Sequence, residues 1–116
     1  MDFSQITHMH ISWLQDILSN IQNPARLDPD QIARDDACEL GKWINSVDAR
    51  YRHLPEYAEL DTVHRELHQA ASDAVVLAQA GKIKESRECL SIDGSCVETS
   101  KRVLDCAARL LAKMNA

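Results

Sequence analysis

His64 and His68 stand four residues apart in the sequence. On a helix this spacing is about one turn, so both imidazole rings can point at the same ion. The same spacing also occurs where two histidines are simply half-buried on a helix face, and the pair leaves both interpretations open. Other residues are needed to choose between them.

His10 strengthens the case for a metal. It falls on the apolar stripe of residues 2–21, together with Trp13, Leu14 and Ile17. A titratable ring is poorly placed on such a face unless it has a partner there. We therefore expect His10 to meet the histidine pair inside the fold.

Cys38 supplies a fourth candidate ligand, at the start of a short predicted helix. The partial positive charge of a helix N-terminus lowers the pKa of a thiol and favours the thiolate that binds metals. Three imidazoles and one thiolate have the number and type that suit tetrahedral zinc. The sequence predicts that Zn²⁺ binds to His10, Cys38, His64 and His68.

A site with four protein ligands is closed, whereas catalytic zinc keeps one position open for water or substrate. Glu66 does not restore an enzyme, because the metalloprotease pattern needs a glutamate directly after the first histidine and Glu66 comes two residues later. We expect a sensory or structural site and no catalytic activity.

The positions of these residues require helices. Apolar residues at helical spacing predict helices over residues 2–21, 37–47, 55–80 and 83–114, with a loop over 23–30, a stop at Gly81 and a kink at Gly94. Gly41 lies inside the second of these helices, which suggests close backbone packing there. The expected fold is all-α: an antiparallel four-helix bundle in which a short helix carries the cysteine.

Composition limits the other function classes. The 116 residues are 45% hydrophobic with a net charge of −5, which predicts one domain over residues 1–116 and no basic stripe for nucleic acid. No apolar run reaches the ~20 residues needed to span a bilayer, and residues 1–8 do not resemble a signal peptide. We expect a cytoplasmic domain without membrane insertion and with reduced thiols. Cys89, Cys96 and Cys106 are expected to fill the core.

Three segments resemble a known family in its own motif order: His10-Ile-Ser-Trp13, Cys38-Glu-Leu-Gly41-Lys42-Trp43 and His64-Arg-Glu-Leu-His68. The chain is similar to the chemoreceptor zinc-binding domains of bacterial chemotaxis receptors and diguanylate cyclases. The resemblance implies that the same four residues are zinc ligands, and that the helical bundle forms homodimers. Family members are commonly fused to a signalling or cyclase module, and the 116 residues contain none, so the signalling partner is expected outside this chain.

The sequence leaves three functions open. A zinc-binding sensor of chemotaxis or cyclic-di-GMP signalling would respond to zinc level or to oxidation of Cys38, both of which the family resemblance implies. A histidine phosphotransfer module is also a small four-helix bundle, but it needs an exposed histidine. A purely structural zinc-stapled dimerisation domain is the third.

Neighbouring residues carry smaller expectations. Asp61, one turn before His64, either accepts the spare N–H of that ring or is an ordinary solvated residue. His8 is two positions from His10 and therefore faces another way on the helix, and His53 is expected to lie exposed in a loop.

Overall fold

The computed structural model describes residues 3–116, and every regular element in this range is a helix. The all-α class is therefore confirmed. The expected helix start at residue 2 and the side chain of Phe3 lie outside the described part. In chain order the elements are α1 (Phe3–Asn20), η1 (Pro24–Arg26), α2 (Pro29–Ala33), α3 (Glu39–Ser46), η2 (Ala49–Tyr51), α4 (Pro55–Gln79), α5 (Ile83–Leu90) and α6 (Ser95–Met114).

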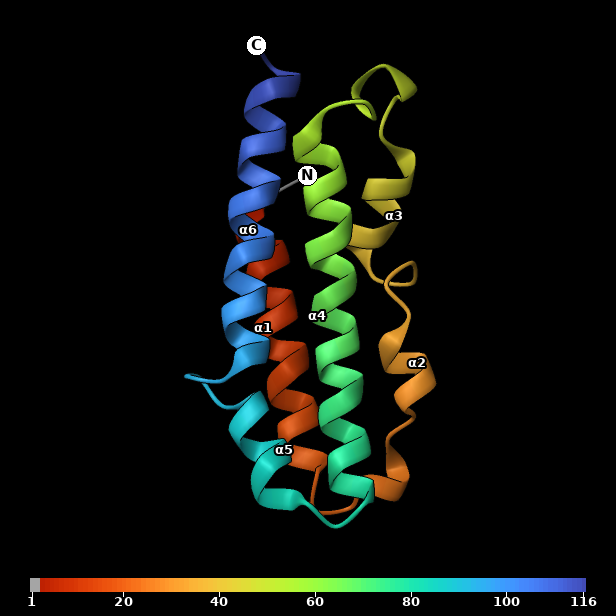
Figure 1. The fold of residues 1–116 in the computed structure, drawn as a ribbon, viewed down its shortest axis with the longest axis vertical. Coiled ribbons are helices and arrows are strands. Elements are labelled where there is room, and N and C mark those ends of the chain that lie inside the picture. Colours follow the sequence, from red (N-terminus) through yellow and green to blue (C-terminus); the bar gives the residue numbers. More distant parts are fainter. Residues whose placement is uncertain (1–2) are drawn as a thin grey trace.

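The molecule is elongated, with extents of 48 × 24 × 20 Å. Figure 1 shows α1 and α4 running in one direction, while α2 followed by α3, and α5 followed by α6, return in the other. Helix α4 is central: it packs against α2, α5 and α6, and α1 packs against α5 and α6. No helix over residues 3–116 has both the length and the apolar character to cross a bilayer.

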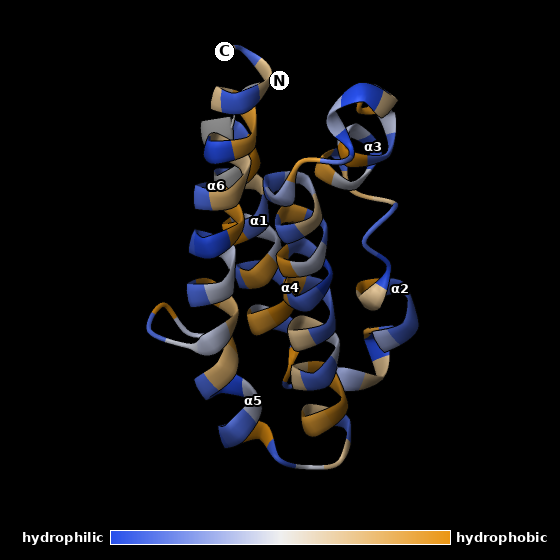
Figure 2. Cartoon of the chain, turned by 45° about the horizontal axis from the view of Figure 1, so that its top comes forward, coloured by the Kyte–Doolittle hydropathy of each residue, from blue (hydrophilic) through white to orange (hydrophobic). Residues whose placement is uncertain are grey.

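The core follows from the spacing of apolar residues along these helices. Figure 2 shows hydrophobic and hydrophilic residues alternating along α1, α4 and α6, as amphipathic helices require. Leu14, Leu60, Leu67 and Leu110 are fully buried, with relative exposures of 0%. The three long helices thus share one core, and polar groups in it must find partners inside the protein.

Helix α4 has the ends that the sequence predicted. Pro55 occupies its first turn, where the missing N–H costs no helical hydrogen bond. Gly81, two residues after the end of α4, has a φ of +86°. Residues other than glycine rarely adopt this left-handed backbone conformation. The resulting helix has 25 residues, long enough to carry His64 and His68 near its middle.

The loop predicted over residues 23–30 is wrong in part. Pro24–Arg26 forms a 3-10 turn and Pro29–Ala33 forms the short helix α2. The carboxylate of Asp28 accepts hydrogen bonds from the backbone N–H groups of Asp30 and Gln31, and Pro29 takes the first helical position. Proline there starts a helix rather than breaking one, which is why the segment folds as it does.

The long last helix predicted over residues 83–114 is also wrong, because residues 91–94 divide it into α5 and α6. Gly94 donates its N–H to the carbonyl of Ser91 at 2.8 Å and has an extended backbone just before α6. A Cβ atom at this position would collide with the carbonyl oxygens of Glu88 and Cys89. The glycine therefore marks a complete break and a sharp return of the chain, not a kink in one helix.

The core predicts the effect of truncation. Leu110→Ala leaves a cavity at a fully buried position and should lower the free energy of unfolding by about 2–5 kcal/mol, measured by urea denaturation of the metal-free protein. Val76, which is 50% exposed on α4, is the matched position, and Val76→Ala should change stability far less. Equal effects of the two substitutions would contradict the described core.

Candidate metal centre

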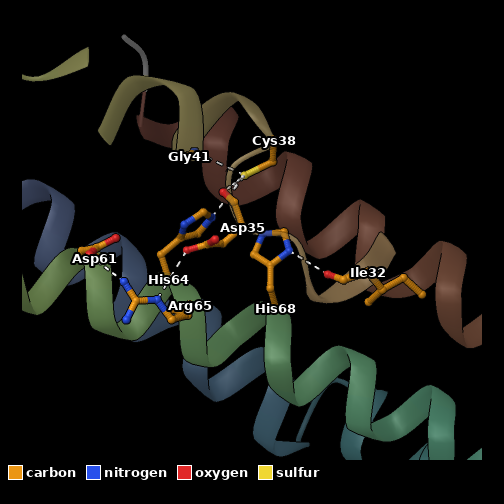
Figure 3. A network of polar contacts seen from close by, with 8 residues as sticks. All are labelled: Ile32, Asp35, Cys38, Gly41, Asp61, His64, Arg65 and His68. Carbon is orange, nitrogen blue, oxygen red and sulfur yellow. Dashed lines mark hydrogen bonds and ion pairs between the residues drawn. The ribbon is translucent and has the colours of Figure 1, made fainter. Parts of the chain in front are cut away.

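Three helices bring the predicted ligands to one point. His10 comes from α1, Cys38 immediately precedes α3, and His64 and His68 come from α4. One nitrogen or sulfur atom from each of the four residues lies within 4.8 Å of the others, a grouping able to hold a metal ion. Figure 3 shows the rings of His64 and His68 rising from α4 on the side where Cys38 lies.

The distances within the group suit a small tetrahedral ion. The Cys38 Sγ lies 3.1 Å from His64 Nε2 and 3.8 Å from His10 Nε2. In a tetrahedron with zinc bonds of 2.0–2.3 Å, neighbouring donor atoms are roughly 3.3–3.8 Å apart. These two distances lie close to the tetrahedral values, whereas the group as a whole spans up to 4.8 Å, so its widest pair would have to close by about 1 Å to hold zinc.

Two of the histidine rings are oriented by backbone carbonyls. His10 Nδ1 donates to the carbonyl of Ile6 and His68 Nδ1 to the carbonyl of Ile32, each at 3.0 Å. Such bonds fix the proton on Nδ1 and leave the lone pair of Nε2 for a metal. In His68 this Nε2 is buried and has no hydrogen-bond partner among residues 3–116, which fits the role of a metal ligand.

His64 differs from the other two rings. Its Nε2 faces the Cys38 sulfur, whereas its Nδ1 is buried and has no hydrogen-bond partner in the part of the chain that the structure describes. Asp61 does not accept from this ring; its carboxylate instead accepts a 2.9 Å hydrogen bond from Arg65. The second of the two roles left open for Asp61, an ordinary surface residue, is the one consistent with this geometry.

Burial keeps all three rings neutral. Loss of hydration lowers the pKa of His10 to about 4 and that of His64 to about 3, from an ordinary value of 6.5, and lowers the pKa of His68 as well. The three side chains have relative exposures of 0–4%. Neutral imidazole is the form that binds metals, so the histidines need no deprotonation at neutral pH.

Cys38 departs from expectation in two ways. It is the N-cap of α3 and not a residue of its first turn, and burial raises the pKa of its thiol, whereas the helix N-terminus was expected to lower it. Hydrogen bonds from the backbone N–H groups of Gly41 and Leu40 oppose the effect of burial without exceeding it. A divalent cation is what would stabilise the thiolate here, since metal coordination deprotonates a thiol.

Gly41 is explained by the chain segment that leads to Cys38. A Cβ at Gly41 would collide with the carbonyl oxygen of Asp35, so the loop can fold tightly onto α3 only when this residue is glycine. The Cys38 sulfur in turn lies 3.4 Å from Gly41 N, which donates to it. The close packing predicted from the sequence thus holds the cysteine over the histidines.

The other end of α3 is held by side chains of the following segment. Arg52 donates to the carbonyls of Val47 and Asn45, and the Tyr57 hydroxyl donates to the carbonyl of Ile44. These bonds satisfy carbonyls that a helix C-terminus leaves without partners. Helix α3 is therefore fixed at its C-terminal end by ordinary hydrogen bonds, while its N-terminal end carries Cys38.

The remaining candidates lie away from the centre. His8, His53 and Glu66 are exposed, and Glu66 pairs with Arg102. Cys96 and Cys106 are buried in the core as expected, and Cys89 is half-buried. The carbonyls of Ile6 and Ile32, which orient two of the histidine rings, could not be recognised from the sequence. Every residue has a backbone carbonyl, so the residue type does not reveal which of them bind a side chain.

A family model, the chemoreceptor zinc-binding domain, matches residues 10–75. The match covers more than half of the chain and includes all four grouped residues, and the chain belongs to this family. It is accordingly a zinc-binding sensory domain, and Zn²⁺ is its metal cofactor. Searches of curated proteins and of solved structures found no match.

The neutral histidines predict a pH dependence. Their pKa in the unfolded chain is about 6.5 and is lowered on folding, so their contribution to stability is complete above that pH and is lost as the pH falls towards 4. When the pH of metal-free protein falls from 7 to 5, His10 and His64 should each lower the free energy of unfolding by on the order of 2 kcal/mol.

Urea denaturation in the presence of a chelator would measure this slope. The variant His10→Leu should lose part of it, whereas His8→Leu should retain it, because His8 is exposed on the same helix. A stability that stays constant between pH 7 and 5 would contradict the neutral, buried state of the rings.

The glycine contact predicts a second effect. Gly41→Ala should lower the unfolding free energy by about 1–3 kcal/mol, because the new Cβ forces the Asp35 carbonyl away, and this exceeds the gain of roughly 1 kcal/mol in helix propensity. Lys42→Ala, at an exposed neighbouring position of α3, should be nearly neutral. A Gly41→Ala variant more stable than wild type would show that the loop does not pack on this residue.

Proposed function

We propose that this domain regulates bacterial signalling, in chemotaxis or through cyclic-di-GMP, by responding to zinc level or to oxidation of Cys38. The proposed ligands are His10, Cys38, His64 and His68. The observation that carries the proposal is the buried donor set itself, in which two imidazoles are oriented by backbone carbonyls and one thiol closes the group. These four side chains are enough to complete a tetrahedral zinc site.

Cys38 is the ligand best suited to receive the signal. It is half-buried, whereas the three histidines are buried, so small oxidants reach its sulfur most easily. A two-electron oxidant such as hypochlorous acid transfers its oxygen to the thiolate, giving a sulfenic acid and chloride. The product is no longer a thiolate ligand, and the group is left with three imidazoles.

The attachment of α3 offers a readout. Cys38 joins the N-terminal end of this short helix to the histidines of α1 and α4, and Leu40 and Ile44 pack it onto the core. Loss of the sulfur as a ligand would weaken that end while Arg52 and Tyr57 still hold the other. A local release of this kind is a change that a partner surface can recognise.

The wider assignment rests on the family and on the fold. We infer a single domain over residues 1–116, an antiparallel four-helix bundle whose second and fourth members are interrupted, and a cytoplasmic homodimer without catalytic activity. A signalling protein, or a fused module outside these 116 residues, would receive the output. The absence of a basic stripe in the sequence supports the exclusion of nucleic acid.

Burial weakens the phosphotransfer alternative. The three grouped histidines are 0–4% exposed and therefore inaccessible to a docking response regulator. A permanent structural staple is the remaining alternative, and it differs from a sensor in exchange: a staple retains zinc against moderate chelators, whereas a sensor releases it.

The experiment that tests the function is zinc stoichiometry and affinity of the purified chain. Wild type should bind about one zinc per chain, and Cys38→Ala and His10→Ala should each weaken binding by about 100-fold or more, because each removes a ligand. His8→Ala is the matched control two residues along α1 and should bind as wild type does. Wild type that binds no zinc would refute the assignment.

A second measurement separates the sensor from the staple. Stoichiometric hypochlorous acid should release zinc to a coloured chelator and raise amide hydrogen exchange in α3 more than in α4. A thiol reductant should reverse both changes if the sulfur stops at the sulfenic acid. Zinc that resists both oxidant and chelator would identify the centre as structural.

A further inference from the structure

A polar cavity adjoins the metal centre on the side of His64. It has a volume of about 160 Å³, is partly open to solvent and lies between the segment preceding α3, α3 itself and α4. Its lining includes Asp35, Asp36, Asp61, His64 and Arg65, and the Asp36 carboxylate is paired with Arg34. A space of this size holds several water molecules or a hydrated ion.

His64 is the only one of the four grouped residues that lines this cavity. It is fully buried, at 0% exposure, and its Nδ1 has no hydrogen-bond partner among the described residues. The corresponding nitrogens of His10 and His68 are both bonded to backbone carbonyls. His64 therefore has one ring nitrogen without a partner among the described residues, and its side chain borders the cavity.

The negative charges of Asp35 and Asp61 at this cavity are partly neutralised by Arg65. Arg65 lies 2.9 Å from the Asp61 carboxylate and 3.8 Å from that of Asp35, so one guanidinium faces two negative charges. Figure 3 shows Asp35 between the rings of His64 and His68, with its carboxylate joined to Arg65.

We propose that this cavity is the entry and exit port of the metal centre, in which the carboxylates of Asp35 and Asp61 take up hydrated Zn²⁺ and pass it to His64. The proposal rests on the zinc-binding function. The three histidines are buried, so a hydrated dication in solvent does not reach them directly. An adjoining pair of carboxylates with one spare negative charge concentrates cations there and speeds their capture.

Arg65 acts as the counter-charge of the port. Its side chain is 63% exposed, and at the cavity it pairs with Asp35 and Asp61. An arriving dication can therefore displace the guanidinium into solvent. The same guanidinium limits how strongly the carboxylates retain the ion, which favours transfer to the histidines over trapping.

The test is the rate of zinc uptake by metal-free protein, followed by stopped-flow fluorescence. Trp13 is the reporter, because its ring centroid lies 4.7 Å from that of His68. Asp35→Asn with Asp61→Asn should slow association by about tenfold while changing the equilibrium Kd by less than threefold, since a port affects entry and exit alike. Arg65→Gln should speed association.

The control is Glu66→Gln, which removes one negative charge, against two in the double variant, from a residue of α4 that pairs with Arg102 outside the cavity. Its association rate should equal that of wild type. Circular dichroism and urea denaturation of each variant would exclude loss of the fold as the cause of a slow rate.

Two results would overturn the proposal. Unchanged association in the aspartate variant would mean that zinc enters elsewhere. A raised Kd caused by faster dissociation alone would mean that the carboxylates hold the bound ion. Wild type that takes up no zinc would instead refute the zinc-binding function, so the two failures are distinguishable.

Discussion

Three imidazoles and a thiol meet inside an apolar core, and the remaining structure depends on how that polar cluster is stabilised. A buried polar group without a partner costs roughly 1–3 kcal/mol, and this cluster contains two unpartnered ring nitrogens. Burial also holds the rings in their neutral form. The cluster is thus unfavourable in isolation and complementary to a divalent cation, which links folding of the centre to metal binding.

The surrounding elements are arranged to aim the donor atoms. Helix α4 supplies two rings from successive turns, and α1 supplies the third from the opposite side of the core. The carbonyl of Ile6 orients a ring from within its own helix, whereas that of Ile32 comes from α2. The short helix α2 therefore contributes to the centre through a backbone carbonyl, although none of its side chains belongs to the group of four.

Much of this arrangement could be predicted from sequence. The helical class and the central helix α4 followed from periodicity, and the residues of the centre followed from type, spacing and family resemblance. The break at residues 91–94 did not, because apolar spacing continues across it and only the carbonyls facing Gly94 reveal the turn. The pKa of Cys38 was predicted in the wrong direction because burial, which sequence does not show, outweighs the amide hydrogen bonds.

Helix α3 is anchored differently at its two ends. Arg52 and Tyr57 bind its C-terminal carbonyls through contacts that need no metal, while its N-terminal end carries Cys38 beside the buried Leu40. The two ends of the helix therefore differ in chemistry: one is held by hydrogen bonds that no oxidant alters, and the other carries a sulfur atom that an oxidant can modify. If the proposed function holds, a reaction at this one atom changes how one end of a segment of 8 residues is attached, and leaves the other end in place.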